Sequence, residues 1–338
     1  MKDHPDTQRL LDIVNRFSRA KILLLGDFVA DEFIDGEISR VSREAPVLIL
    51  KHRGTAIVPG GAANAANNLA DLEAQVFPFS VVGQDEAGRR LIDMFKAKGV
   101  RVNGLLTDRS YSTPTKSRIL AGSAHTTHQQ VVRIDREPAS APHSGVISRI
   151  YQLALKNASR VDAMVISDYG LGWITPGRIA SLRALAKKRG IPILLDSRYR
   201  LRGFRGFTAA TPNEAEVEAA LGVSIGNNLR ALEPAGRRLL RHLGSEALLV
   251  TRGREGMALF ERGRKTVHIP IFGTDQITDV TGAGDTVIAV FTLALACGAN
   301  FVEAAHLSNY AGGLVVMKHG TATVRLKELI SAVQSETR

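Results

Sequence analysis

The sequence has a single cysteine, Cys297, in a chain of 338 residues. One cysteine excludes an internal disulfide, and its position in an apolar helical run predicts a buried, packed side chain. No run reaches the ~20 apolar residues that a membrane-spanning helix needs. The first 20 residues show an amphipathic helix pattern at 6–18 and no signal-peptide core. We therefore expect a cytoplasmic protein without a membrane partner.

The two commonest nucleotide-binding loops are also missing. Neither Gly-x-x-x-x-Gly-Lys-Ser/Thr nor, at the first strand, Gly-x-Gly-x-x-Gly occurs, which argues against P-loop and dinucleotide-binding proteins. The net charge is +11 (44 Lys and Arg minus 33 Asp and Glu), which favours phosphorylated ligands. The basic residues are scattered without interleaved aromatic residues, so a solvated basic surface is a better explanation than a nucleic-acid partner.

Strand and helix patterns alternate along most of the chain. After a first strand at 21–26, strands are predicted at 76–82, 163–167, 191–195, 247–251 and 257–260. Helices are predicted at 60–72, 86–98, 175–189, 213–221, 231–242, 283–296, 301–318 and 326–333. This alternation predicts an α/β fold with a mostly parallel central sheet and helices on both faces. We expect one such domain over residues 21–338, after an N-terminal helix within residues 1–20.

Two segments interrupt this alternation, at about 31–57 and 113–135. Both alternate apolar and polar residues in broken pieces, which predicts strands of one small antiparallel sheet beside the main domain. In parallel sheets, ligands bind beyond the carboxyl ends of the strands. Asp27, Asp168 and Gly253 follow predicted strands and Thr251 ends one, so all four should meet there.

The most informative stretch is Asp-Val-Thr-Gly-Ala-Gly-Asp-Thr at 279–286, just before a long apolar run. Gly282 and Gly284 permit backbone angles that a Cβ would hinder, and such a turn at a helix start directs several N–H groups toward an anion. Asp285 would repel that anion, but it is suited to taking a proton from a hydroxyl that attacks a bound phosphate. An N-capping aspartate in a glycine turn is the less favoured alternative, because one carboxylate suffices for a cap.

A second glycine pair, Gly60 and Gly61, opens a predicted helix and lets a ligand approach the backbone. Asn64 on this helix can hydrogen-bond sugar hydroxyls as donor and acceptor. An ordinary packing helix explains the same residues, and for this segment alone that explanation is preferred. Asp27 and Asp31 can hold vicinal hydroxyls, although turn formation by aspartate is an equally good explanation.

In this order, the segments around 60–64 and 279–285 resemble the two signatures of the ribokinase-like (PfkB) carbohydrate kinase family, and the resemblance spans about residues 20–333. The sequence is most similar to the D-glycero-β-D-manno-heptose-7-phosphate kinase branch, the kinase domain of a bifunctional heptose kinase/adenylyltransferase. The residues that carry this likeness are 26–27, 41–47, 59–64, 129–130, 133, 167–169, 211–213, 216, 249–252 and 279–287.

The resemblance implies a ribokinase-like fold with a small β lid that often mediates a homodimer. It implies that the chain uses ATP and Mg²⁺ to phosphorylate the C1 hydroxyl of a heptose 7-phosphate. The implied catalytic residues are the base Asp285 and an anion hole of Gly282, Ala283 and Gly284. The implied ATP-binding residues are Asn213, Glu214, Ala215, Glu216, Thr251, Gly253, Asn309, Lys318 and Gly320, with Glu216 acting on Mg²⁺ through water. The expected substrate-binding residues are Asp27, Asp31, Gly60, Gly61, Asn64, Lys116, Arg133 and Asp168.

The sequence departs from that branch at several places. Asp-Ser-Arg stands at 196–198 where the branch usually has Asp-Pro-Lys, and Val41 to Pro46 differ from the usual lid sequence. The bifunctional relatives carry a nucleotidyltransferase domain after the kinase, and we expect this sequence of 338 residues to lack one. Two alternatives stay open: a kinase of the same family for fructose, ribose or adenosine, and a sugar- or nucleotide-sensing protein without catalysis. For the 7-phosphate, the basic candidates are Arg43, Lys116, Arg118 and Arg133.

Overall fold

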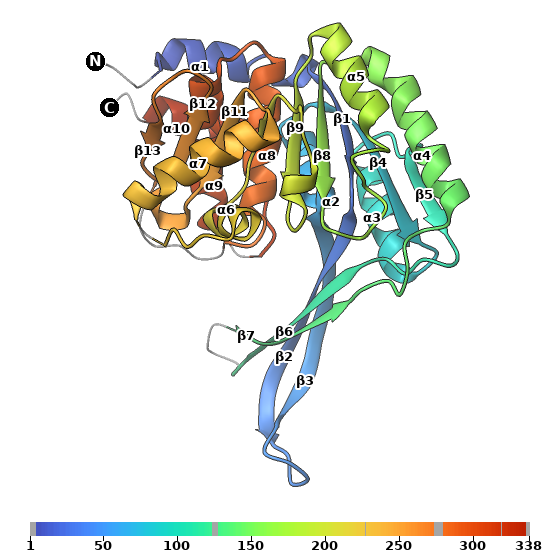
Figure 1. Cartoon of the computed structure of the whole chain (residues 1–338). Helices are drawn as coiled ribbons and strands as arrows, with labels where there is room; N and C mark the ends of the chain where they lie inside the picture. Colours follow the sequence, from blue (N-terminus) through green and yellow to red (C-terminus); the bar gives the residue numbers. More distant parts are fainter. Residues whose placement is uncertain (1–4, 124–127, 227, 274–279, 319, 336–338) are drawn as a thin grey trace.

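The structure, a computed structural model, describes residues 5–123, 128–226, 228–273, 280–318 and 320–335. Within these ranges a nine-stranded sheet has the order β13-β12-β11-β10-β9-β8-β1-β4-β5 (Figure 1). All neighbours from β11 to β5 are parallel, whereas β12 and β13 pair antiparallel at one edge. The predicted mostly parallel sheet is confirmed.

The strands of this sheet, in chain order, are β1 (Lys21–Gly26), β4 (Gln75–Gly83), β5 (Leu105–Asp108), β8 (Ala163–Asp168), β9 (Ile193–Ser197), β10 (Ala209–Ala210), β11 (Ala247–Thr251), β12 (Met257–Glu261) and β13 (Val267–Ile269). The helices are α1 (Thr7–Val14), α2 (Ala62–Asp71), α3 (Glu86–Ala97), α4 (Ser144–Asn157), α5 (Ala180–Arg189), α6 (Glu214–Leu221), α7 (Leu229–Leu243), α8 (Ala283–Ala296), α9 (Phe301–Val316) and α10 (Leu326–Ser335).

Helices cover both faces of the sheet, as the sequence predicts, and β1 shows the reason. Ile22 and Leu24 of β1 belong to a hydrophobic core with α1, α2, α3, α8, α9 and α10. Leu23 and Leu25 point the opposite way, into a second core with α4, α5, α6 and α7. Since successive strand residues face opposite sides, a strand buried on both faces must be apolar at every position.

A second sheet of four strands projects from the domain (Figure 1). Its strands are β2 (Phe28–Val41), β3 (Leu48–Gly61), β6 (Thr115–Gly122) and β7 (Gln129–Arg136), in the order β3-β2-β6-β7. The two interrupting segments therefore form one small sheet, as predicted, which we call the lid. The expected fully antiparallel pairing is wrong at its centre, where β2 and β6 are parallel. No hairpin joins β2 to β6, because β3, α2, β4, α3 and β5 lie between them in the sequence. A connection of this length allows the two strands to pair in parallel.

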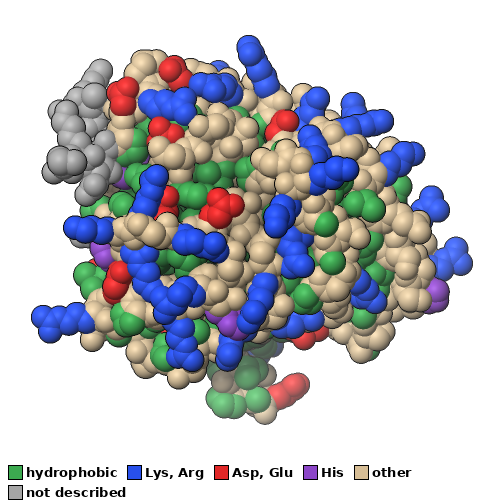
Figure 2. Space-filling view, turned by 45° about the horizontal axis from the view of Figure 1, so that its top comes forward, with side chains coloured by type: hydrophobic (Ala, Val, Ile, Leu, Met, Phe, Trp, Pro, Cys, Tyr) green, Lys and Arg blue, Asp and Glu red, His purple; other side chains and the backbone are tan. Residues whose placement is uncertain are grey.

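Most predicted elements are found within a few residues of their expected bounds. Helix α5 starts at Ala180, five residues later than predicted, because residues 176–179, which include Pro176 and Gly177, form turns. Four elements were not predicted from the sequence: α4, β5, the two-residue β10, and β13. In the described part of the chain, no helix is both long and apolar enough to cross a membrane. Figure 2 shows Lys and Arg side chains spread over the visible surface, in keeping with the net charge of +11.

Candidate active site

Asp285 lies in the first turn of α8, at the carboxyl ends of the parallel strands, and is 5% exposed. Its Oδ1 accepts a hydrogen bond of 2.7 Å from the Tyr169 hydroxyl. Its Oδ2 accepts a bond of 3.0 Å from the Asn64 amide. Tyr169 follows β8 and Asn64 lies on α2, so the α/β topology brings three distant segments to one carboxylate.

Desolvation by burial raises the pKa of Asp285 from 3.8 to about 7. The hydrogen bonds from Tyr169 and Asn64 and the charge of Arg198 oppose this rise, whereas Asp31 adds to it. A carboxyl group with a pKa near neutrality can take up a proton during a reaction and release it afterwards. This property favours proton transfer over simple helix capping.

The helix start around Asp285 has the glycine geometry that the sequence predicts. Gly282 has φ +81°, and a Cβ there would lie 2.4 Å from the Asn64 amide nitrogen. Gly284 differs, because a Cβ at this position would meet no atom within 4 Å. The Ala283 N–H donates to the Val280 carbonyl at 3.2 Å, whereas Gly284 and Asp285 lie in the first helical turn, where N–H groups lack intrahelical acceptors. Open space beside such groups is suited to an anion.

The second glycine pair also stands at this site. Gly61 is the N-cap of α2 with φ +56°, and a Cβ there would lie 3.3 Å from the Tyr169 ring. A Cβ on Gly60 would lie 2.5 Å from an Asp31 carboxylate oxygen. The pair therefore lets the start of α2 and the Asp31 carboxylate approach the loop after β8.

Asn64 is held in place by a buried network. The Asn68 amide donates to the Asn64 side-chain oxygen at 3.2 Å, and the Thr286 hydroxyl donates to the Asn68 oxygen at 3.1 Å. Buried polar networks of this kind fix side-chain orientation. Asn64 thus presents its amide to Asp285 in a defined geometry.

Asp27 and Asp168 are engaged by donors from the protein itself. Asp27 Oδ2 accepts from the backbone N–H of Tyr169 at 2.7 Å. Asp168 accepts from the Ser197 hydroxyl at 2.9 Å and from Arg200 at 2.7 Å. Burial, followed by the charge of Asp168, raises the pKa of Asp27 to about 7. In this structure both carboxylates orient the loop that carries Tyr169, and their contact with a substrate stays a prediction.

Asp31 lies on the lid side of the site and is 4% exposed. Arg118 of β6 donates to its Oδ1 at 2.6 Å, and the Thr321 hydroxyl donates to its Oδ2 at 3.0 Å. An ionised carboxylate has about four lone-pair sites, so two donors leave it able to accept a ligand hydroxyl. Arg118, considered as a phosphate ligand, is instead paired with Asp31.

A cavity of about 340 Å³ also adjoins the start of α8, and its lining does not include Asn64, Asp31 or Tyr169. Six predicted residues line it: Asn213, Thr251, Gly253, Ala283, Gly284 and Asn309. Its remaining walls are mainly apolar or glycine, including Met257, Val287 and Val316. A small, largely apolar cleft with a few polar groups at one end is typical of sites for a planar base with phosphates.

The other residues predicted at the nucleotide lie outside this cavity lining. Lys318 pairs with Glu328 at 2.8 Å and donates to the Thr323 carbonyl at 2.7 Å. Gly320 lies next to the ring of Phe33, and Glu214 pairs with Arg252 at 2.7 Å. Ala215 is an exposed residue of α6.

Glu216 belongs to the capping box of α6, where its carboxylate accepts from the Asn213 N–H at 2.9 Å. Burial raises the pKa of Glu216, and the Arg198 charge opposes the rise. The pKa of Asp196 is raised more strongly, through burial and then through the charges of Glu216 and Asp285. Among the residues with described positions, no three His, Cys, Asp or Glu side chains group so as to hold a metal ion. Asp279 lies outside the described residues.

The lid cations predicted to contact a substrate phosphate are partly neutralised. Lys116 and Arg133 both pair with Asp135, at 3.1 and 2.9 Å. Lys116 lies near the junction with the main domain, in a pocket that Tyr169 also lines, whereas Arg133 is about half exposed. The structure therefore brings Lys116, but not Arg133, into a pocket next to Asp285.

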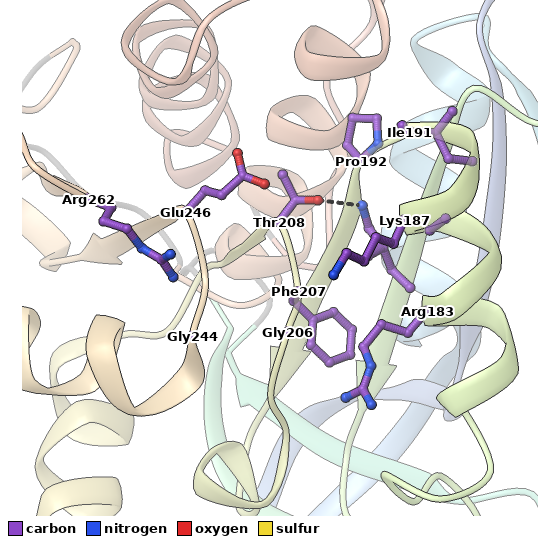
Figure 3. Close-up of a pocket in the computed structure, with 13 residues that line it drawn as sticks. Arg183, Lys187, Ile191, Pro192, Gly206, Phe207, Thr208, Gly244, Glu246 and Arg262 are labelled. Carbon is purple, nitrogen blue, oxygen red and sulfur yellow. Dashed lines mark hydrogen bonds between the residues drawn. The ribbon is translucent and has the colours of Figure 1, made fainter.

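A cavity of about 440 Å³ at the amino ends of the parallel strands does not belong to this site (Figure 3). It lies where β9, β10 and β11 begin, and its cations include Arg183 and Arg262. Both guanidinium groups donate to backbone carbonyls, of Arg205 and Ser245 respectively. Ligands of parallel sheets bind at the carboxyl ends of the strands, and this cavity lies at their amino ends.

Two residues of the site had no role assigned from the sequence. Tyr169 follows Asp168 directly, but nothing in the sequence shows that its hydroxyl reaches α8. Thr321 lies far along the chain from Asp31 and is joined to it only by the fold. The only sequence feature that could have indicated a role for Tyr169 is its position directly after Asp168, at the end of a predicted strand.

The sequence matches the family model described as pfkB family carbohydrate kinase over residues 25–328. It is similar to the "Bifunctional protein HldE" of Geobacter metallireducens, with 42% identity over 92% of this chain. The protein of the same name from Pelobacter propionicus is 38% identical over 97% of this chain. The chain spans 62% and 66% of the length of these two relatives.

Solved structures with the same fold include Arabidopsis thaliana ribokinase complexed with ribose and ATP. That structure has a TM-score of 0.70 and 19% identity, and the alignment covers 93% of this chain and 99% of the ribokinase chain. The tetrameric inhibited form of Escherichia coli phosphofructokinase-2 has a TM-score of 0.75 and 16% identity, covering 94% and 100% of the two chains. These likenesses confirm the ribokinase-like fold.

Proposed function

This chain belongs to the pfkB family of carbohydrate kinases, and we propose that it transfers the γ-phosphoryl group of ATP to the C1 hydroxyl of D-glycero-β-D-manno-heptose 7-phosphate. As a family member it is a phosphotransferase that acts on a sugar hydroxyl. The observation that carries the proposal is the buried carboxyl of Asp285, with a pKa of about 7, between the glycine helix start and Asn64. The choice of heptose rests on the likeness to the heptose-7-phosphate kinase branch.

In the proposed reaction, Asp285 accepts the proton of the C1 hydroxyl while the C1 oxygen forms a bond to the γ-phosphorus. The bond from that phosphorus to the leaving oxygen of ADP breaks in the same step. The N–H groups of Gly284 and Asp285 and the α8 dipole stabilise charge on the transferred group. On the sugar side, Asp31, Asn64, Gly60 and Gly61 hold the ring hydroxyls.

The cavity next to α8 fits ATP as the phosphoryl donor. Its apolar end, with Met257, Val287 and Val316, is suited to the base. Asn213, Thr251 and Gly253 line the same cavity and would hold the ribose and phosphates. Mg²⁺, when bound, neutralises phosphate charge. Mg²⁺ usually keeps several waters beside substrate phosphates, and Glu216 would act on it through a water.

The experiment that tests this function compares sugars at fixed MgATP. ADP formation is measured with heptose 7-phosphate, fructose, ribose and adenosine. We expect kcat/KM for heptose 7-phosphate to be the highest of the four. A higher value for fructose, ribose or adenosine would assign the chain to another substrate in the family, and calorimetric binding of sugar and ATP without ADP formation would favour the sensing alternative.

The raised pKa of Asp285 predicts an acidic limb in the pH profile. Below a pH of about 7 the free protein carries a protonated Asp285, which cannot accept the hydroxyl proton. We therefore expect kcat/KM to fall about tenfold per pH unit below that value. In Tyr169→Phe, the hydrogen bond that lowers the pKa is lost, so the midpoint should move to higher pH. An unchanged or lower midpoint would contradict this assignment.

A homodimer through the lid is proposed as well. Exposed apolar side chains gather on the lid: Ile38, Val41, Leu48, Val131, Val132 and Ile134, each at least 36% exposed. Such a set on a projecting sheet suits a second copy of the chain. The cytoplasmic location expected from the cysteine content remains a prediction.

Light scattering tests the dimer. We expect a mass of twice 36.5 kDa for the protein and a single-chain mass for Val132→Asp combined with Ile134→Asp, because charges would be buried in the interface. Leu155→Asp, on the exposed side of α4, is the control and should stay dimeric. A single-chain mass for the unmodified protein would exclude the dimer.

A further inference from the structure

A narrow pocket lies where the lid joins the main domain. Its lining includes Val29, Lys116, Asp135, Arg136, Tyr169 and Arg198. Tyr169 joins this pocket to the active site, because it lines the pocket and its hydroxyl donates to Asp285 at 2.7 Å. Val29 pairs with Gly60 in the β2–β3 register, which places the pocket next to the glycine pair.

Three cations line this pocket, and they differ in how they are paired. Lys116 pairs with Asp135 at 3.1 Å, and Arg136 pairs with Glu32 at 3.1 Å. For Arg198, the described residues provide no ion pair, and its guanidinium lies 5.8 Å from the ring centre of the adjacent Tyr199. Arg198 is also exposed, so its charge is available to a ligand.

The backbone fixes Arg198 beside Tyr169. Strand β9 pairs with β8 so that Ser197 is opposite Asp168, and the Arg198 N–H donates to the Asp168 carbonyl at 3.0 Å. The two residues that follow these strands therefore leave the sheet side by side. Burial raises the pKa of Asp285 and of Glu216, and the Arg198 charge opposes both rises, which places the guanidinium within electrostatic range of the reaction site.

We propose that this pocket binds the phosphate monoester of the sugar substrate and that Arg198 is the residue that selects for it. The proposal rests on the proposed sugar-phosphate kinase function. The acceptor hydroxyl lies at Asp285 on one side of Tyr169, and the phosphate at the far end of the sugar lies on the other side. Lys116 of the lid and Arg198 of the main domain both line this pocket and would contact the phosphate.

The chemistry of the three cations favours this division of roles. A guanidinium can bind a phosphate through two parallel N–H···O bonds, which a carboxylate-bound ammonium cannot match. Lys116 and Arg136 keep their carboxylate partners in the structure and add only positive potential. Loss of Arg198 should therefore remove the directed contact and leave a weaker, less selective attraction.

The test compares two substrates that differ only in the phosphate. kcat/KM is measured with heptose 7-phosphate and with the same heptose lacking the phosphate, for the unmodified protein, Arg198→Met and Arg198→Lys. We expect the ratio of the two values to fall about 10–100-fold in Arg198→Met, the size of one or two charge-assisted hydrogen bonds, and to recover partly in Arg198→Lys. Arg90→Met, which removes an exposed arginine of α3, is the control and should keep the ratio.

The outcomes separate this inference from the proposed function. If the unmodified protein uses both sugars equally well, the sugar-phosphate kinase function itself is wrong. If it prefers the phosphate and Arg198→Met keeps that preference, the function stands and the role of Arg198 is refuted. An equal fall in kcat on both sugars would also refute it, because Arg198 would then act on the transferred group. Melting temperatures confirm folding, and Arg198→Gln replaces any variant that fails to fold.

Discussion

Replacing Asp285 with asparagine is expected to lower kcat by about 10²–10⁴-fold, the usual contribution of a general base. Asparagine keeps the size of the side chain and can still accept the hydrogen bond from the Tyr169 hydroxyl. It cannot take a proton at neutral pH, so the C1 hydroxyl would have to attack without a base. The measurement is ADP formation at saturating ATP and heptose 7-phosphate.

Stability and nucleotide affinity serve as controls for this variant. The pKa of Asp285 is raised above 3.8 in the folded protein, so folding disfavours the charged carboxylate. The contribution of Asp285 to the free energy of unfolding therefore falls as the pH rises from about 4 to about 7. Asp285→Asn removes this penalty at pH 8 but loses the hydrogen bond from Asn64, because two amide donors would then face each other. We therefore expect a melting temperature close to that of the unmodified protein, and ADP should still bind. Turnover within a few-fold of the unmodified protein would refute the assignment of the base.

Replacing Gly284 with valine is the second change with a large expected effect. A Cβ at Gly284 meets no described protein atom within 4 Å, and the φ of Gly284 is not positive, so a residue with a Cβ causes no backbone strain there. The same space lies in the proposed nucleotide cavity beside the free N–H groups of α8. A branched side chain there would exclude the γ-phosphate, and we expect kcat/KM to fall on the order of 10²-fold or more.

Gly177 provides a matched control for this variant. A Cβ at Gly177 would likewise meet no atom within 4 Å, and its φ is not positive, but this residue lies in the turn before α5. Gly177→Val should keep kcat/KM within about twofold, since surface changes away from the site are usually small. Gly284→Ala should fall between the two. If Gly284→Val is as active as Gly177→Val, the α8 start is not the phosphate site.

The sequence was most predictive where a local motif sets the geometry. Residues close together in the sequence determine the glycine turn before α8, which has Asp285 in its first turn. The same is true of the individual strands and helices, whose alternation predicts the fold class. The mostly parallel sheet and the lid followed from the resemblance and the polar–apolar pattern. The two-residue β10 and the short β13 were not predicted, because strands that short have no periodicity of their own.

The partners of the site carboxylates could not be predicted from sequence. Asp27 and Asp168 follow strands just as a ligand-binding aspartate would, yet both accept bonds from the loop that positions Tyr169. Asp31 was predicted at the sugar, but its pairing with Arg118 depends on the parallel register of β2 and β6. Contacts between strands far apart in sequence are fixed by the fold and leave no local signal.

The central claim is phosphoryl transfer from ATP to C1 of the heptose, and ³¹P NMR of the reaction tests it most directly. The protein is mixed with MgATP and heptose 7-phosphate, and the phosphorus signals are followed until ATP is consumed. We expect ADP together with a sugar that carries two phosphate esters, the new one coupled to the C1 proton. ADP with inorganic phosphate alone, or a new ester at another carbon, would contradict it.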